Sequence, residues 1–573
     1  MAAIFDYGGA NFLRIREKRM YYVDRTAYLD RLENVNSRFL IFLRPRRFGK
    51  SLWISILDHY YGVQHKDKFE MLFGDLAIGK TPTDLANQYL MLNFNFSAIE
   101  SKNNETTYRG FLSNVKDGVK RFFKNYPPLF SKEAQAEILA NQEPEHVIQA
   151  LFSQSKDFDN KIYILIDEYD HFANELISFN LSLFQDIVTK NGWVRKFYET
   201  IKTATEQGIV DRFFATGVSP VTLDSMTSGF SITTDLSLDT DFNEMFGFTD
   251  TEVEELLVTI GVPLKDQRTT MEDLHRWYDG YLFHPRSNQK VFNPTMVLYF
   301  AKYFLRKKQY PEVMLDTNIA SDYSKIRKLF HISFNKPTDN YSILYDLVRG
   351  KTTYVPVTRQ FSFELGFSED DLMSLLFYMG FLTADKVRGS KWSLKFPNKV
   401  VESLYQKFFI ESVERRYGLN RSFTQLSQAL DSFYWSNDPL PFLNMVGEVM
   451  KKDLSNRDAI GMNEKDLKYL IISYLHLSPE FYIKSEHEVE RKYNDILLRR
   501  RKPFDMPHNY LIELKYFKTS LTENALEIEK QKAITQVKGY LKTEELSEYD
   551  DLKAWVWMAV GSEWVFVKEI EGA

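Results

Sequence analysis

The chain has 573 residues, a formal net charge of −5, 44% hydrophobic residues and no cysteine. Its length is too great for one hydrophobic core, so two to four domains are expected, and its small net charge means that nucleic-acid contact must come from local basic patches. The absence of cysteine excludes disulfides, thiolate catalysis and Cys-ligated zinc or iron–sulfur sites.

Short apolar runs separated by longer helical stretches fill the first third of the chain. Four buried strands are predicted, at residues 38–43, 89–97, 161–170 and 211–219, and an amphipathic helix begins shortly after the first of them. Strands that alternate with helices in this way indicate a largely parallel sheet flanked by helices. We therefore expect an α/β domain over residues 1–245.

Helical patterns dominate from about residue 247 to residue 415, interrupted by a predicted hairpin at 381–397, and a linker is expected around 434–442. An α/β pattern then returns, with a predicted helix at 463–477 and five strands at 481–489, 493–500, 510–517, 553–561 and 564–570. These patterns predict three further regions: a mostly helical lid or winged-helix-like region over 246–415, a helical linker over 416–461 and a second α/β domain over 462–573.

The stretch FLRPRRFGKS contains the second half of the phosphate-loop pattern G-x-x-x-x-G-K-[ST], in Gly49, Lys50 and Ser51. It follows an apolar strand and opens a helix. In phosphate loops at such a junction, backbone N–H groups and the lysine bind phosphate, and the serine hydroxyl helps to hold Mg²⁺. Arg44 stands where the first glycine belongs. We predict that Arg44, Arg46 and Arg47 contact phosphate, with a solvated basic edge as the alternative.

Acidic residues follow the third predicted strand, in the run YILIDEYD. Asp167 would enter the magnesium shell, and Glu168 beside it would polarise the attacking water. At the tip of the fourth strand, Thr216 and Ser219 would sense the γ-phosphate. The second strand looks like the inserted strand of the catalytic-glutamate branch of P-loop ATPases, and the ordered motifs predict ATP or GTP binding. Three residues stay open as an arginine sensor: Arg195, Arg212 and Arg276.

The second α/β domain carries a further group of charged residues. Glu513 and Lys515 lie two positions apart on one predicted strand, so their side chains share a face, and Asp495 lies on a neighbouring strand. Two such carboxylates can hold Mg²⁺, and a lysine beside them can orient water and stabilise developing charge. A basic run between these strands is predicted to contact a phosphate backbone, with a solvated turn as the alternative: Arg499, Arg500 and Arg501.

Eight short motifs stand out along residues 5–400: YYVDRTAYLDRL, RPRRFGKS, LIDEYD, TGVS, FGFTDTEVEELL, WYDGYLF, FNP and LLFYMGFLT. Together they resemble the AAA-ATPase-like family, in which arginine and proline are usual where the generic loop has its first glycine. The resemblance implies that Tyr278 and Tyr281 belong to a cluster that packs the lid. It also implies a C-terminal PD-(D/E)xK nuclease domain, which members of this family often carry.

Residues 462–573 resemble that PD-(D/E)xK superfamily, whose fold is the restriction-endonuclease-like α/β fold. The resemblance implies that Glu464 is an acid near the metal, that Glu486 supports the metal shell, and that Gln536 contacts nucleic acid from the following helix. The sequence departs from the strict pattern at Asn494, where the motif has proline. The carboxylates and the lysine of the motif are retained, so an active site is expected.

The motifs together predict a two-part enzyme, in which a P-loop ATPase that uses ATP and Mg²⁺ is fused to a Mg²⁺-dependent endonuclease. DNA is expected as the substrate rather than RNA, with nucleotide state gating cleavage. Family resemblance implies a place in prokaryotic defence or mobile-element biology. Two alternatives stay open: a nucleotide-dependent switch or scaffold with a catalytically silent nuclease fold, and an ATPase that acts on proteins.

The sequence also bears on location and partners. No apolar run approaches the ~18 residues needed to cross a bilayer, and residues 1–12 show no signal-peptide pattern. We therefore expect a cytoplasmic protein without membrane contact, and we leave open whether it forms a homo-oligomer.

Overall fold

The computed structural model describes residues 4–100, 102–173, 192–221, 232–316, 330, 340–361, 368–419, 421–454, 463–489 and 492–571. They form two compact units. The N-terminal unit comprises Met1–Arg306, Thr317–Thr338 and Thr352–Lys399, and the C-terminal unit comprises Lys307–Asp316, Asp339–Lys351 and Val400–Ala573. Within the described ranges, no helix is both long and apolar enough to span a bilayer.

The N-terminal unit is built on a five-stranded parallel sheet: β1 (Phe39–Leu43), β2 (Leu90–Asn95), β3 (Ile162–Asp167), β4 (Val210–Gly217) and β5 (Thr234–Asp235). The four longer strands confirm the sequence prediction. Their order is β2-β3-β4-β1-β5, so β4 lies between the phosphate-loop strand and the acidic strand. The expectation that residues 89–97 form the inserted strand is therefore wrong. The cause is that the order of strands along the chain does not determine their order in a sheet.

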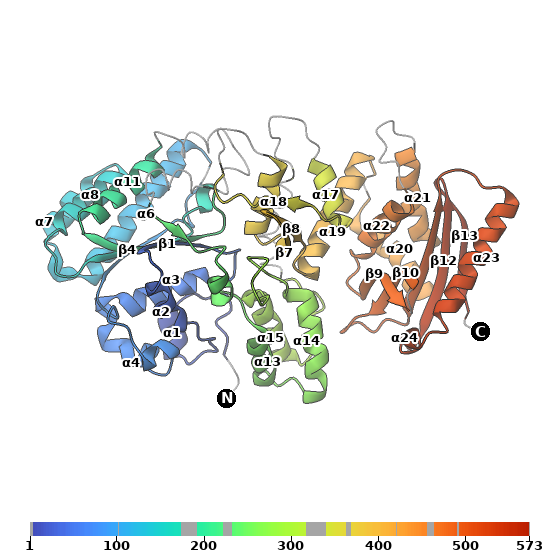
Figure 1. Cartoon of the computed structure of the whole chain (residues 1–573), viewed down its shortest axis with the longest axis horizontal. Helices are drawn as coiled ribbons and strands as arrows, with labels where there is room; N and C mark the ends of the chain where they lie inside the picture. Colours follow the sequence, from blue (N-terminus) through green and yellow to red (C-terminus); the bar gives the residue numbers. More distant parts are fainter. Residues whose placement is uncertain are drawn as a thin grey trace. The chain divides into compact units, whose positions relative to one another are not determined.

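Both faces of this sheet are buried, as expected for parallel strands with crossover helices. One face is covered by α6 (Asn104–Asn125), α8 (Pro144–Gln154) and α11 (Trp193–Glu206), and the other by α3 (Lys50–Tyr61) with the shorter helices around it (Figure 1). The shorter elements of this part are α1 (Phe12–Glu17), α2 (Ala27–Glu33), η1 (Val63–Lys68), α4 (Phe69–Phe73), α5 (Ala77–Lys80), η2 (Pro127–Leu129) and α7 (Lys132–Ala140).

The rest of the N-terminal unit is mostly helical. Its helices are η3 (Thr240–Met245), α13 (Asp250–Thr259), α14 (Leu264–Tyr278), α15 (Pro294–Lys307) and α18 (Glu369–Tyr378). A small antiparallel sheet, β6 (Tyr354–Val355), β8 (Lys391–Lys395) and β7 (Thr383–Arg388), contains the predicted hairpin. Tyr278 and Tyr281 are buried, and the ring of Tyr281 packs edge-on against Phe48 at 5.0 Å, which confirms a packing role for this motif.

The C-terminal unit contains a five-stranded sheet of order β13-β12-β11-β10-β9. The strands are β9 (Phe481–Val489), β10 (Lys492–Arg500), β11 (Asn509–Phe517), β12 (Leu552–Val560) and β13 (Glu563–Ile570). Among the described strands of this sheet, only β11 and β12 pair in parallel. All five strands were predicted from the sequence. The helices are α17 (Asn340–Val348), α19 (Lys399–Arg416), α20 (Phe423–Ser436), α21 (Leu440–Leu454), α22 (Glu464–Leu475), α23 (Glu523–Tyr540) and α24 (Glu544–Ser547).

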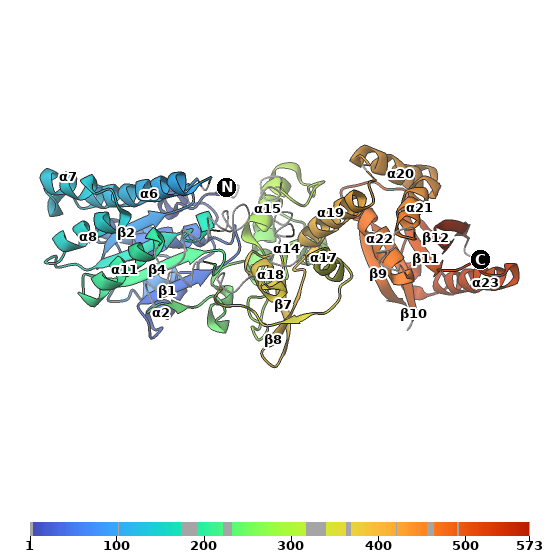
Figure 2. The same cartoon turned by 90° about the horizontal axis from the view of Figure 1, so that it is seen from above.

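Helices cover both faces of this second sheet, with α23 on one face and α20 to α22 on the other (Figure 1 and Figure 2). The segment expected as a linker forms α20 and α21, which pack on the sheet. The ring of Phe433 lies 4.6 Å from that of Tyr510, and the Trp564 indole donates to the carbonyl of Leu443 at 2.6 Å. These two helices are thus part of the core of the C-terminal unit, since they bury its aromatic face.

Candidate active sites

The phosphate loop lies between β1 and α3, as the sequence predicted. Gly49 adopts a left-handed backbone with φ 97° and immediately precedes the helix, and Arg47 is also left-handed with φ 67°. The ring of Phe48 is buried, which anchors the loop on the core. The Lys50 side chain is buried, and its Nζ donates to the carbonyl of Pro45 at 3.0 Å. The lysine therefore closes the loop on itself.

Two acidic residues, one at the last position of β3 and one directly after it, have pKa values shifted in opposite directions. Burial raises the pKa of Asp167 to about 6, although a hydrogen bond from Ser51 opposes the shift. Asn95 also donates to Asp167, over 3.2 Å. Burial would also raise the pKa of Glu168, but the contact with His171 and the charge of Lys50 outweigh it and lower this pKa to about 2. Glu168 is thus an ionised carboxylate, and its backbone is left-handed with φ 55°.

A cavity of about 470 Å³ joins these elements. Its lining includes five of the predicted residues: Arg47, Gly49, Lys50, Ser51 and Glu168. Its other walls are largely apolar and are lined by Tyr21, Tyr22, Trp53, Phe246 and Phe248, among others. A cavity of this volume, lined by both charged and aromatic side chains, suits a ligand that carries phosphates and a planar ring.

Two predicted phosphate contacts lie elsewhere in the structure. Arg44 is 1% exposed, and its guanidinium donates to the backbone carbonyls of Leu43, Ser237 and Phe242 at 2.7 to 3.0 Å. Arg44 therefore has a structural role in place of the predicted phosphate contact, since both of its Nη atoms donate inside the protein. Thr216 is buried and donates to the carbonyl of Phe42 at 2.7 Å, so its hydroxyl joins β4 to β1.

Sequence reasoning assigned no site role to two cavity residues, Arg25 and His171. Arg25 pairs with Glu252 at the start of α13 and donates to the carbonyl of Gly247 at 2.8 Å. The only available signal was the position of Arg25 within the motif YYVDRTAYLDRL, which did not reveal its partner. The three arginines left open as sensors are absent from the described lining of the cavity: Arg195, Arg212 and Arg276.

In the C-terminal unit the predicted acids and lysine come together. Ile496 on β10 pairs with Ile512 on β11, so Asp495 and Glu513 are the next residues along these antiparallel strands. Lys515 Nζ lies 2.7 Å from Glu513 Oε1. Asp495 Oδ2 accepts the N–H of Leu514 at 2.9 Å, which holds its carboxylate against β11. The structure thus brings these three side chains together.

Helix α22 adds two side chains to the same site. Glu464 Oε2 accepts the N–H of Tyr516 at 3.0 Å, and this brings the helix N-terminus to β11. Lys468 Nζ lies 3.5 Å from Asp495 Oδ1 and is buried. Lys468 was not predicted, although it stands one helical turn after Glu464 and so shares its helix face. Glu486 lies on β9, and its side chain is outside the described part of the chain.

The charges of this site fit a divalent cation. Burial and the nearby Asp495 carboxylate raise the pKa of Glu513 to about 7. Burial raises the pKa of Glu464 as well. Burial alone would lower the pKa of Lys515, but Glu513 and the other acids raise it. Glu513 Oε2 is buried and accepts no hydrogen bond from the described part of the chain. Carboxylate oxygens without enough donors are the ligand set that Mg²⁺ prefers, so these residues fit the ion.

The three arginines of the basic run predicted to reach nucleic acid all contact other parts of the protein, and one of them is buried. Arg501 is buried and donates to the backbone carbonyls of Pro479 and Glu312, so the structure corrects its expected role. Arg500 is half-buried and pairs with Asp551 at 3.5 Å, and Arg499 lies over the ring of Tyr482. Gln536, also half-buried, donates to the Tyr540 hydroxyl at 2.6 Å.

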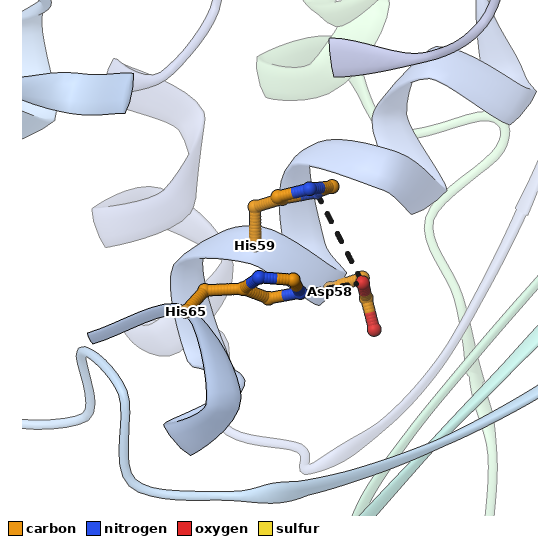
Figure 3. Close-up of side chains that lie close together, drawn as sticks. All are labelled: Asp58, His59 and His65. Carbon is orange, nitrogen blue, oxygen red and sulfur yellow. Dashed lines mark hydrogen bonds and ion pairs between the residues drawn. The ribbon is translucent and has the colours of Figure 1, made fainter. Parts of the chain in front are cut away.

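One other cluster in the described part of the chain has the residue types of a metal site: Asp58, His59 and His65. Figure 3 shows the two imidazoles lying one over the other, with ring centroids 4.1 Å apart and planes 21° from parallel. Nitrogen lone pairs lie in the ring plane, so those of stacked rings do not converge on one ion. His59 Nδ1 also bonds to the carbonyl of Ser55 at 2.7 Å, and Asp58 accepts from Asn93. This cluster is therefore a satisfied polar contact.

These observations define the class of protein. A parallel sheet whose strand β1 leads through a phosphate loop into helix α3 is a P-loop fold. The second sheet, with its paired acids and lysine, is of the restriction-endonuclease type. Accordingly, residues 6–227 match the family model "Predicted AAA-ATPase", and residues 462–569 match the model "PD-(D/E)XK nuclease superfamily". The chain thus combines an AAA-ATPase-like domain with a nuclease-superfamily domain.

Similar proteins of known sequence or structure were also found. The chain is 23% identical over 412 residues to the "Uncharacterized protein in vnfD 5'region" of Azotobacter chroococcum mcd 1, covering 69% of this chain and 68% of that protein. Cdc6p from Pyrobaculum aerophilum gives a TM-score of 0.25 at 10% identity, over 67% of this chain and 91% of that one. The Aeropyrum pernix ORC1 protein in complex with DNA gives 0.24 at 11% identity, over 69% and 95%. Likenesses at these TM-scores carry no further argument.

Proposed function

We propose that this protein binds and hydrolyses ATP in the N-terminal cavity. The observation that carries this proposal is the convergence of Lys50, Ser51 and Glu168 on one cavity, with Asp167 in contact with Ser51. Lys50 would leave the Pro45 carbonyl and bind the β- and γ-phosphates, and Glu168 would accept a proton from the attacking water. Ser51 and Asp167 would hold Mg²⁺, which neutralises phosphate charge when bound.

We further propose that the C-terminal unit is a Mg²⁺-dependent nuclease that acts on DNA. Asp495, Glu513 and Glu464 would hold the ion, which supplies charge neutralisation and a more acidic water. Lys515 would orient that water and stabilise negative charge at the phosphate. The 2.7 Å contact of Lys515 with Glu513 supports this assignment, because it keeps the lysine beside the carboxylates.

We infer that nucleotide state gates cleavage, because both activities reside on one chain. The test measures cleavage of plasmid and single-stranded DNA with Mg²⁺ or Mn²⁺, with and without ATP. Glu513→Ala should abolish cutting, whereas Glu563→Ala, at an exposed carboxylate of the same unit, should not. Lys50→Ala should abolish the ATP response, whereas Lys132→Ala on exposed α7 should not. Wild-type protein that cuts equally well at every nucleotide concentration would refute gating. A role in prokaryotic defence or mobile-element biology extends the same proposal.

A second candidate is a nucleotide-dependent switch or scaffold whose nuclease fold binds a partner without cutting. One observation favours it: Arg501 is buried and Arg500 is paired, so the basic run offers less charge to a phosphate backbone than the sequence predicted. The switch or scaffold hypothesis predicts ATP binding without cleavage of DNA or RNA under any nucleotide condition. Cleavage that depends on Glu513 would exclude it.

A further inference from the structure

One ring nitrogen in the N-terminal cavity faces two groups of opposite kind. His171 Nδ1 lies 3.2 Å from Glu168 Oε2 and 3.1 Å from Arg46 Nη2. A carboxylate only accepts hydrogen bonds and a guanidinium only donates them. An imidazole nitrogen either carries a proton and donates or carries a lone pair and accepts. His171 Nδ1 can therefore serve Glu168 or Arg46, but not both at once.

We propose that His171 is a positioning residue for Glu168 and that Arg46 competes with Glu168 for the same nitrogen. When Arg46 occupies Nδ1, Glu168 loses its donor. When Arg46 moves away, Nδ1 donates to Glu168 and holds the carboxylate in place for the attacking water. This inference rests on the proposed ATP hydrolysis, in which Glu168 acts on that water.

The local backbone explains why Glu168 needs such a donor. A left-handed backbone in a residue other than glycine is strained by roughly 1 kcal/mol, so the surrounding contacts must hold it. The N–H of His171 donates to the carbonyl of Glu168 at 3.1 Å, which ties the two residues into one tight turn. Their side chains are only 15% and 19% exposed, so water competes weakly for the contact between them.

The position of Arg46 links this contact to the nucleotide. Arg46 belongs to the phosphate loop and, like His171 and Glu168, lines the cavity. A bound triphosphate brings several negative oxygens to that loop, and arginine binds phosphate through strong charge-assisted hydrogen bonds. Arg46 would then exchange His171 Nδ1 for phosphate, and Nδ1, once it takes up a proton from water or by exchange of the ring tautomer, would donate to Glu168. Glu168 would thus become positioned only when a triphosphate is present.

The experiment measures kcat for ATP hydrolysis and, separately, the Kd for ATP. His171→Ala should lower kcat about 10-fold to 100-fold, as expected for a misplaced reactive group, while Kd changes less than about 3-fold. His146→Ala is the matched control, because His146 Nδ1 faces Glu143 at the same three-residue spacing but on the exposed surface. That control should leave kcat and Kd unchanged. His171→Gln should recover part of the loss, since an amide carries a separate donor and acceptor.

Two double variants separate positioning from a general structural effect. In a Glu168→Gln background, His171→Ala should cause no further loss of kcat, because it acts through Glu168. The effect of Arg46→Ala on kcat should differ between His171 and His171→Ala backgrounds, because the two residues share one nitrogen. Additive effects in either cycle, or full kcat in His171→Ala, would overturn this inference while leaving hydrolysis intact. Failure of the wild-type protein to bind ATP would instead overturn the proposed function.

Discussion

Replacing Glu513 by glutamine should stabilise the metal-free C-terminal unit at alkaline pH. Glu513 is 1% exposed, and burial together with Asp495 raises its pKa from an ordinary 4.5 to about 7. Glutamine has the same shape and keeps an oxygen for the hydrogen bond from Lys515. The substitution therefore removes the cost of the buried charge with little change in packing.

The magnitude follows from the two pKa values. Below pH 4.5 Glu513 is protonated in both the folded and unfolded states, so its ionisation costs no stability. Between pH 4.5 and about 7 the unfolded state releases its proton first, and the free energy of unfolding falls by about 1.36 kcal/mol for each pH unit. The full cost of about 3 kcal/mol is reached above pH 7. Glu513→Gln should therefore gain up to ~3 kcal/mol at pH 8 and almost nothing near pH 4.5.

The assay is urea-dependent hydrogen exchange, read by mass spectrometry on peptides from β11 and β12, which reports the stability of this unit separately from the other. It is run in EDTA at pH 5 and pH 8. Glu563→Gln, at an exposed carboxylate on β13, is the control and should behave as the wild type at both values. Mg²⁺ should stabilise the wild type at pH 8, because it neutralises the carboxylates, and should stabilise Glu513→Gln less.

The pH dependence decides the outcome. A gain from Glu513→Gln that is the same at pH 5 and pH 8 would show that packing, and not ionisation, controls the stability of this site. A loss of stability at pH 8 would show that the Glu513–Lys515 ion pair outweighs the cost of burying the charge, and would refute the reasoning.

Three further predictions test the structure. Arg44→Ala should lower the stability of the N-terminal unit by about 3 kcal/mol or more, because three buried carbonyls lose their donor. Thermal unfolding measures this loss. An unchanged melting temperature together with weakened ATP binding would instead show that Arg44 contacts phosphate. Gly280→Ala should lower the stability of the N-terminal unit by several times the ~1 kcal/mol expected for Gly208→Ala. Both glycines have a left-handed backbone, but only at Gly280 would an added Cβ overlap the Pro397 carbonyl. Equal melting temperatures of the two variants would contradict this. Lys468→Met should slow DNA cleavage at least ~10-fold with an unchanged circular dichroism spectrum, because the cation beside Asp495 is lost; undiminished cleavage would exclude Lys468 from the site.

Local patterns in the sequence were sufficient for the elements and for part of each site. The run FLIFL is buried as a strand because its residues are apolar throughout, and Gly49 precedes a helix because its left-handed backbone suits that junction. Glu513 and Lys515 share a face because strand side chains alternate with period two. Such features depend on neighbours within a few residues, so they can be read before the chain is folded.

The contacts of individual charged side chains could be established only from the tertiary structure. Arg44 and Arg501 look like surface cations in the sequence, yet carbonyls from distant segments surround their guanidinium groups. Lys468 joins the acids, and Arg46 meets His171, only because elements far apart in the chain fold together. The sequence by itself determined which chemical groups stand at the ends of which elements. Only the tertiary structure decided which of them touch, because a long side chain pairs with whatever the fold brings within about 3 Å of its polar atoms.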